Sequence, residues 1–294
     1  MYLTTEPTEQ LTVPRTSPFV PYFEVETLLE KGSSELNEDV LFEKEDMFGV
    51  FDGATSLDRR RFQDGLTGGL LAARTAALAF QQDRSSLYQL AEKANRSIRD
   101  ALFSHQVSID ERHRLWSTSM AVIRLGRSRL EYCQTGDAVI LFIHHDGSYR
   151  VITPDVDIDR ETLQLWQDSG HVPSGSIHDL LADRIRQVRL QMNISYGVLN
   201  GEPESLNFLC HGHEELDNVS DILLFTDGLC LPRESPLEDS DWGSFVNLYR
   251  KGGLQAVRDY VRGLQCTDPA LKKYPRFKLH DDIAAVAIKM NCQN

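Results

Sequence analysis

The chain has 294 residues, with 44 acidic and 31 basic side chains and a formal net charge of −13. Hydrophobic residues make up 41% and charged residues 26%, a balance typical of a folded globular protein that excludes a disordered or fibrous chain. Because a strongly negative protein repels phosphate backbones, the charge also argues against a nucleic-acid partner. We expect a chain that folds by itself.

The sequence shows no pattern of a secretion signal, a membrane span or a thiolate metal site. The longest apolar stretch, residues 66–80, is interrupted by Arg74 and is too short to cross a membrane. The five cysteines are scattered and never form a CxxC pair, so we expect neither a disulfide framework nor a zinc site. These features predict a cytoplasmic protein without a membrane partner, and we expect a monomer.

The N-terminal segment differs in composition from the rest of the chain. Residues 1–21 mix Thr, Glu and several prolines without periodicity, which predicts a flexible leader. Residues 22–294 are long for one small domain, yet layered sheet proteins of this length often share one core. We therefore predict a single domain over residues 22–294.

Strand patterns come first in the predicted domain and are followed by two helical patterns. Residues 24–29 predict a strand, and the β-prone runs 40–42 and 48–51, separated by the polar Glu45 and Asp46, predict a hairpin. Residues 62–80 and 85–103 carry apolar residues at helical spacing. We interpret these two segments as helices that face the core.

The second half of the chain repeats this block order. Four strand-like segments at 119–125, 129–133, 139–144 and 149–152 are joined by turn residues and predict an antiparallel meander. The remaining predicted elements are helices at 159–168, 178–188 and 245–263, the last broken at Gly252 and Gly253, and strands at 222–225 and 283–290. Since strands and helices come in blocks and not in βαβ units, the order favours an α+β layered fold.

Four acidic sites share one context, in which a β-prone apolar run meets one or two carboxylates. They are Asn37-Glu38-Asp39 before residues 40–42, Asp52-Gly53 after 48–51, Asp227-Gly228 after 223–226, and Asp281-Asp282 before 283–286. Carboxylate oxygens are the ligands that Mg²⁺ and Mn²⁺ prefer, and a glycine carbonyl can approach a metal closely. A single Asp-Gly pair is most simply a turn, but four such sites at strand ends predict an oxygen-only metal site.

With these motifs the sequence resembles the type-2C, metal-dependent family of serine/threonine protein phosphatases. The motifs span residues 35–290 and are, in order, Asn37-Glu38-Asp39, residues 48–54 around Asp52-Gly53-Ala54, Ser117-Thr118, Thr135-Gly136-Asp137-Ala138, Tyr196-Gly197-Val198-Leu199, residues 225–229 around Asp227-Gly228, and Asp281-Asp282-Ile283-Ala284. No single motif is decisive, whereas the ordered set is specific.

The resemblance implies a fold, an activity and a set of site residues. The implied fold is a four-layer α-β-β-α sandwich, in which two antiparallel sheets are flanked by helices. The implied activity is hydrolysis of phosphoserine and phosphothreonine in phosphoproteins, the products of serine/threonine kinases. Carried over by motif, Asp52 would bridge two metals, Gly53 with Glu38 and Asp39 would serve one of them, Asp227 and Asp281 the other, and Asp137 a third, weaker metal.

The resemblance also implies the cofactor and the chemistry. We expect two or more Mn²⁺ or Mg²⁺ ions per chain, with Asp52, Asp227 and Asp281 as the catalytic core. Two cations about 3.5–4 Å apart share a water and lower its pKa, so that a bridging hydroxide attacks phosphorus directly.

Two residues of the family pattern are missing. Family members of eukaryotes carry His after the Asp-Gly pair, where this chain has Ala54, and the family's arginine before the Glu-Asp pair is absent from residues 32–36. Lys31 and the run Arg59-Arg60-Arg61 are candidate replacements, although a basic run is more often a solvated helix start. The general acid and the phosphate-binding residue therefore stay unassigned.

Two other functions remain open: a phosphatase for a small phosphometabolite, and a catalytically weak pseudophosphatase that serves as a binding module. The pair Asp157 and Asp159 resembles the aspartates of haloacid-dehalogenase-like phosphatases but lacks the strand that should precede it, so a helix cap is favoured. We expect substrate choice to reside in residues 154–197.

Overall fold

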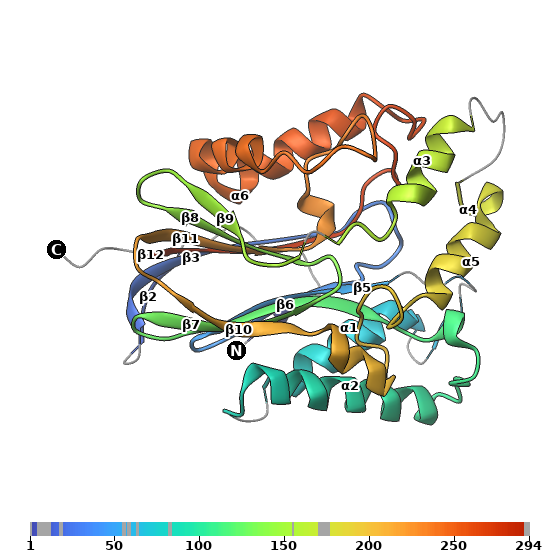
Figure 1. Cartoon of the computed structure of the whole chain (residues 1–294), viewed down its shortest axis with the longest axis horizontal. Coiled ribbons are helices and arrows are strands. Elements are labelled where there is room, and N and C mark those ends of the chain that lie inside the picture. The colour runs from blue at the N-terminus through green and yellow to red at the C-terminus, as the bar shows by residue number, and fades with distance from the viewer. Residues whose placement is uncertain are drawn as a thin grey trace.

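The computed structural model describes residues 2–4, 13–17, 20–54, 57, 60–62, 65–81, 84–154, 156–169 and 177–290. Within these ranges two antiparallel sheets of six strands pack face to face, with helices on both outer sides (Figure 1). The predicted α+β sandwich with four α-β-β-α layers is therefore confirmed. Among the described helices, none is long and apolar enough to cross a membrane.

The first sheet has the strand order β1-β4-β5-β6-β7-β10. Its strands are β1 (Tyr2–Thr4), β4 (Asp39–Lys44), β5 (Met47–Gly53), β6 (Thr118–Leu125), β7 (Arg129–Thr135) and β10 (Cys210–Glu215). Strands β4 and β5 form the predicted hairpin, in which Val40 pairs with Phe51 and Asp39 with Asp52. The hairpin thus brings two of the predicted metal ligands to the same end of this sheet.

The second sheet has the order β2-β3-β12-β11-β8-β9. Its strands are β2 (Val13–Ser17), β3 (Val20–Glu30), β8 (Val139–His144), β9 (Tyr149–Val151), β11 (Val219–Phe225) and β12 (Ile283–Met290). The buried strands β11 and β12 pair antiparallel, with Phe225 opposite Ala285. The residues that follow β11 and those that precede β12 therefore lie at the same end of this sheet.

Helices cover the sheets and surround one end of the sandwich (Figure 1). The α-helices are α1 (Gly68–Ala79), α2 (Leu87–Ser104), α3 (Arg160–Asp168), α4 (Ile177–Leu180), α5 (Ala182–Leu190) and α6 (Trp242–Cys266). Short 3₁₀ turns are η2 (Arg112–Arg114), η3 (Pro203–Phe208) and η4 (Asp227–Leu229). The predicted helix at 178–188 is divided between α4 and α5, which lie with α3 beyond the end of the sheets.

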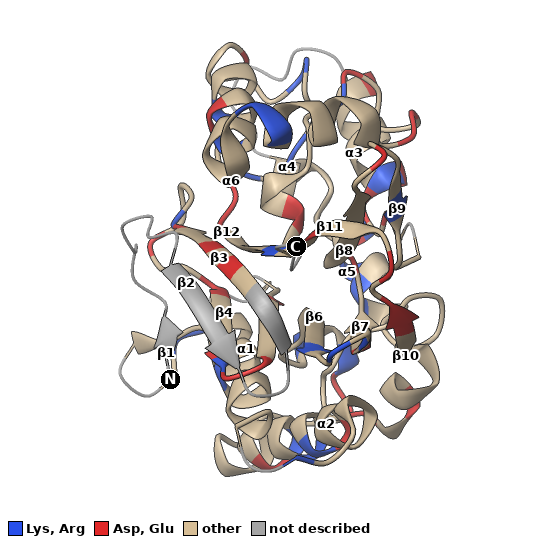
Figure 2. Cartoon of the chain, turned by 90° about the vertical axis from the view of Figure 1, so that its left-hand side faces the viewer, with Lys and Arg blue, Asp and Glu red and all other residues tan. Residues whose placement is uncertain are grey.

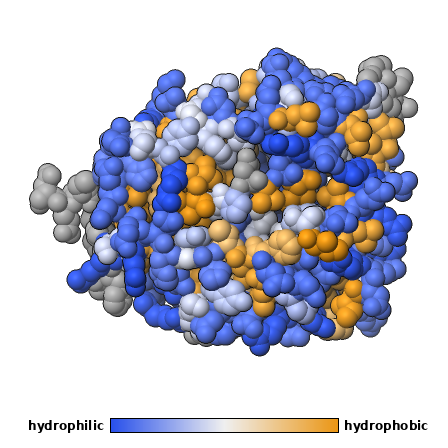
Figure 3. Space-filling model, in the orientation of Figure 1, coloured by the Kyte–Doolittle hydropathy of each residue, from blue (hydrophilic) through white to orange (hydrophobic). Residues whose placement is uncertain are grey.

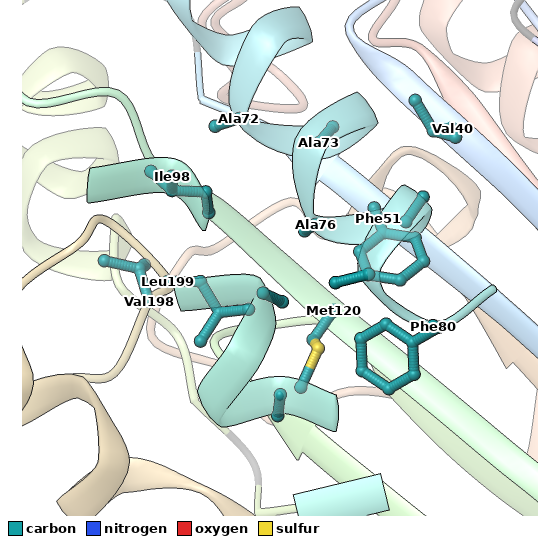
Figure 4. Close-up of a cluster of buried hydrophobic side chains, with 14 of the residues drawn as sticks. Val40, Phe51, Ala72, Ala73, Ala76, Phe80, Ile98, Met120, Val198 and Leu199 are labelled. Atoms are coloured by element: carbon teal, nitrogen blue, oxygen red, sulfur yellow. The ribbon is translucent and has the colours of Figure 1, made fainter. Parts of the chain in front are cut away.

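An aromatic contact marks each of the three interfaces between layers. Phe51 of β5 packs on Phe80 beyond α1 at 5.6 Å between ring centroids, and Figure 4 shows both rings in the apolar cluster under the helices. Phe23 of β3 meets Phe48 of β5 edge-on between the sheets. Phe225 stacks on Phe245 of α6 at 4.8 Å. Buried aromatic and aliphatic surface therefore fixes the spacing of all four layers.

The surface agrees with this layering. In Figure 3 hydrophilic residues cover the helical layers, and hydrophobic residues show in a band between them where the sheets lie. Figure 2 shows acidic and basic residues interspersed over the helices and strands.

The predicted meander of four strands is wrong. β6 pairs with β7 in the first sheet and β8 pairs with β9 in the second, so the chain crosses between the sheets at residues 136–138. Gly136 has φ +76, which favours glycine, and the Gln134 side-chain amide donates to the carbonyls of Gly136 and Ala138 at 2.6 and 3.0 Å. The strands of the two hairpins show similar sequence patterns, so these patterns do not reveal which sheet each strand joins.

Other differences from the predicted elements concern where a helix begins and which strands were not predicted. The helix predicted at 62–80 begins at Gly68, because the Thr67 side chain caps the helix through the amide of Leu70. Strands β1, β2 and β10 were not predicted; β1 and β2 lie in the segment that we interpreted as a leader, and residues 1, 5–12 and 18–19 of it lie outside the described part. The break in α6 is confirmed at Gly253, with φ +67.

Candidate active site

The hairpin of β4 and β5 places two carboxylates directly opposite each other. Asp39 pairs with Asp52 across the strands, an arrangement of like charges that costs stability unless something compensates it. A methyl group on Gly53 would lie 2.4 Å from the Gly69 carbonyl oxygen, so glycine is required here by the close approach of α1. This packing explains Gly53 without reference to a metal.

Asp39 and Glu38 are buried behind the hairpin end, with 2% and 3% of their surfaces exposed. The Thr226 hydroxyl donates to Asp39 Oδ2 at 2.7 Å and so connects the second sheet to the first. Burial and the carboxylate of Asp282 raise the pKa of Asp39 well above its ordinary value, against the effect of the Thr226 hydrogen bond. The surroundings of Asp39 therefore disfavour its ionised form.

Asp227 and Asp281 come from the second sheet. Asp227 opens η4 directly after β11, and Asp281 lies two residues before β12. The next residue, Asp282, accepts hydrogen bonds from the amides of Gly32 at 2.7 Å and Glu38 at 2.9 Å. Asp282 therefore acts as a brace: its two hydrogen bonds hold the segment that carries Glu38 and Asp39 against this end of the second sheet.

Asp137 enters the site through the crossing between the sheets. The left-handed Gly136 turns the chain there, and a methyl group on it would lie 2.4 Å from Ser119 Cβ. Burial raises the pKa of Asp137, and the charge of Asp281 adds to the rise. Because we predicted one continuous meander here, the sequence did not indicate that the crossing between the sheets brings Asp137 near the other carboxylates.

These elements surround a cleft with a volume of about 860 Å³. Five of the seven predicted site residues line it, namely Asp52, Gly53, Asp137, Asp227 and Asp281. Glu38 and Asp39 do not line it and lie behind its wall. Helix α5 forms the opposite wall with Arg186, Arg189 and Val188, so the segment in which we expected substrate choice does border the cleft.

The carboxylates of the cleft oppose one another's ionisation. Burial raises the pKa of Asp52 well above its ordinary value, and Asp39, Asp137 and Asp281 add to the effect. Asp227 is open to solvent from the cleft, yet loss of hydration and the charges of Asp52 and Asp281 raise its pKa in the same way. A group of anions that repel one another in a confined space is a donor set suited to a divalent cation.

The side chains do not close around a metal position as they stand. Within the described ranges, no three His, Cys, Asp or Glu side chains form a group that could hold a metal ion. The donor set is nevertheless chemically suitable for a divalent cation and borders one cleft.

Three residues of the cleft were not identified from the sequence. Lys278 donates to Asp281 Oδ1 at 2.7 Å. Arg189 contacts Ser117 Oγ at 3.3 Å. Burial raises the pKa of Asp159 to about 7 against the effect of Arg189, with Asp137, Asp157 and Asp281 adding to the rise. Asp159 stands at the N-cap of α3 but its side chain makes no capping hydrogen bond, so interpreting it only as a helix cap was incomplete.

The proposed replacements for the missing arginine lie elsewhere. Lys31 is exposed and donates to the Glu35 carbonyl, and Arg61 pairs with the Glu35 carboxylate at 2.7 Å. Arg60 packs over the Phe62 ring. None of these three borders the cleft, and Arg59 lies outside the described residues. Ala54 does line the cleft and offers no proton there.

Known proteins resemble this chain clearly in fold but only weakly in sequence. No family model matches the chain, and no curated protein matches it. Solved structures of serine/threonine phosphatases are similar to it in fold over most of its length. The catalytic domain of the phosphatase PstP in complex with two manganese ions has 14% identity and a TM-score of 0.55, covering 91% of this chain and 97% of that one.

Two further phosphatase structures are similar to the same extent. Stp1 from Staphylococcus aureus has 14% identity and a TM-score of 0.58, with 95% of this chain and 99% of that chain covered. PppA of Pseudomonas aeruginosa has 15% identity and a TM-score of 0.57, with 92% and 99% covered. The fold that the motifs implied, that of the type-2C phosphatases, is thus confirmed.

Proposed function

We propose that this chain is a metal-dependent phosphatase that hydrolyses phosphoserine and phosphothreonine in proteins. The observation that carries the proposal is that carboxylates from distant strand ends, Asp52, Asp137, Asp227 and Asp281, border one cleft. The likeness of the fold to serine/threonine phosphatases, one of them a complex with two manganese ions, supports the same function. The cleft is a feature of this structure, whereas the likeness of fold comes from comparison with other proteins.

In the proposed mechanism Asp52, Asp227 and Asp281 would hold Mn²⁺ or Mg²⁺, the Gly53 carbonyl with Glu38 and Asp39 would serve one ion directly or through water, and Asp137 would serve a third, weaker ion. When bound, such cations neutralise phosphoryl oxygens and lower the pKa of water, so that no nucleophilic side chain is needed. The chain's own residues would orient the phosphate: Arg189 and Arg186 of α5 border the cleft, and Arg189 is positioned by its contact with Ser117 Oγ at 3.3 Å.

The test uses p-nitrophenyl phosphate and a phosphothreonine peptide with added Mn²⁺. We expect hydrolysis by the wild type, none in chelator, and nearly complete loss in Asp52→Ala. Asp239→Ala is the matched control, because the Asp239 side chain is 92% exposed and does not border the cleft. Wild-type protein that stays inactive with Mn²⁺, Mg²⁺ and other divalent cations would refute the proposal.

A catalytically weak binding module is the second candidate function, since Ala54 borders the cleft where related phosphatases of eukaryotes carry His. Calorimetry separates the two: the enzyme binds Mn²⁺ at two or more sites, and the binding module shows no Mn²⁺ binding. A panel of phosphopeptides and small phosphometabolites, assayed side by side, then identifies the substrate class of an active enzyme.

A further inference from the structure

Lys278 lies on a loop between α6 and β12 that is held by buried contacts. Asp268, 5% exposed, accepts from the Tyr274 amide at 2.9 Å and from Arg276 Nη1 at 3.0 Å. At the end of the loop Arg262 Nη2 donates to the Asp281 carbonyl at 2.7 Å. These contacts fix the backbone on both sides of Lys278, so its position is part of the fold.

The Lys278 ammonium lies among the carboxylates of the cleft. Nζ donates to Asp281 Oδ1 at 2.7 Å, and the side chain is only 17% exposed. Lys278 borders the cleft together with Asp52 and Asp227. A positive charge confined in this way compensates part of the repulsion between the anions around it.

We propose that Lys278 is a built-in counter-ion that competes with the divalent cation for Asp281. The inference rests on the proposed role of Asp281 as a metal ligand. A cation that binds Asp281 must displace the ammonium and is repelled by it until the side chain has turned away. On the first sheet, by contrast, Asp39 Oδ2 accepts a hydrogen bond from the neutral Thr226 hydroxyl at 2.7 Å.

Competition predicts that the metal positions fill at separate concentrations. A cation binds first on the side of Asp39 and Asp52, and binding at Asp281 follows at higher concentration. An ordinary structural ion pair would stabilise the loop without changing the affinity for metal, so the affinity for Mn²⁺ distinguishes the two roles.

The experiment is a calorimetric titration of the full chain with MnCl₂. We expect Lys278→Met to strengthen the weaker binding phase by roughly tenfold to a hundredfold, as the removal of one coupled charge does. Lys278→Arg keeps the charge and should titrate within about twofold of the wild type, well below such a coupling effect. Lys273→Met is the matched control, since Lys273 lies on the same loop, pairs with Glu234 and is 55% exposed. A Lys278→Met protein that titrates like the wild type would overturn the inference.

A second measurement needs no variant. Modification of Lys278 by an amine reagent, followed by mass spectrometry, should accelerate when Mn²⁺ releases the ammonium from Asp281. Unchanged reactivity at saturating Mn²⁺ overturns the proposal even if the variant does not fold. If Lys278→Met binds Mn²⁺ more tightly but the wild type hydrolyses no phosphate ester, the counter-ion role stands and the phosphatase proposal fails. If the wild type is an active enzyme and Lys278→Met is unchanged, only the counter-ion role fails.

Discussion

Asp282 should contribute to stability as a brace and not as a metal ligand. Its two carboxylate oxygens accept the amides of Gly32 and Glu38, and the residue is 2% exposed. Asp282→Ala leaves the buried Glu38 amide without its acceptor, at about 1–3 kcal/mol, and the half-buried Gly32 amide, which water can reach, at about 1 kcal/mol. We expect a loss of about 2–4 kcal/mol in the free energy of unfolding.

One effect opposes this loss. Burial raises the pKa of Asp282, so removing its carboxylate also removes an unfavourable buried charge. Asp282→Asn separates the two contributions, because its carboxamide oxygen accepts one amide while its NH₂ group faces the other. We expect Asp282→Asn to fall between the wild type and Asp282→Ala.

Urea unfolding in chelator at pH 7, followed by tryptophan fluorescence, measures the change, with Asp239→Ala as the exposed control. The same variants are then assayed for hydrolysis, because release of the Glu38 segment should also disorder Asp39. If Asp282→Ala unfolds within about 0.5 kcal/mol of the wild type, as surface substitutions do, the bracing argument is wrong.

Three further predictions concern the charge of Asp159 and the backbone at two glycines. Burial raises the pKa of Asp159 to about 7, so the contribution of this group to stability is complete below its unfolded pKa near 4 and is lost as the pH rises from there through 7; in chelator, Asp159→Asn should therefore melt above the wild type by a small margin at pH 5 and by a larger margin at pH 8. Equal melting differences at both pH values would contradict this sign. A methyl group on Gly228 would lie 1.9 Å from the Asp282 carbonyl oxygen, so Gly228→Ala should lower the melting temperature and the activity together. Gly263→Ala, in an open stretch of α6, should instead stabilise by about 0.5–1 kcal/mol, and a destabilised Gly263 variant would show that the helix tolerates the site poorly.

Local patterns explain why much of the site could be predicted. The hairpin that pairs Asp39 with Asp52 is encoded by two apolar runs a few residues apart, and Asp227 and Asp281 border strands that alternate or bury strongly. Convergence of these strand ends came from the motif order and not from any local signal. Two of the predicted residues, Glu38 and Asp39, are buried behind the cleft, because β-pairing alone does not say which side of a strand end faces solvent.

The rest depends on contacts between distant segments. Lys278 sits in a loop without periodicity, and although its partner Asp281 is only three residues away, the loop itself is fixed by contacts from α6 such as that of Arg262 with the Asp281 carbonyl. Asp159 resembled a simple cap because its sequence context is the start of a helix. The only signal for Lys278 in the sequence was its position as a basic residue just before the Asp281-Asp282 motif.

The two sheets supply opposite halves of the proposed metal site, and this division makes its geometry depend on the core between them. Asp39 and Asp52 come with the first sheet, Asp227 and Asp281 with the second, and polar contacts such as Thr226 to Asp39 bridge the two halves. Close-packed side chains such as Phe23 and Phe48 therefore set the separation of the carboxylates.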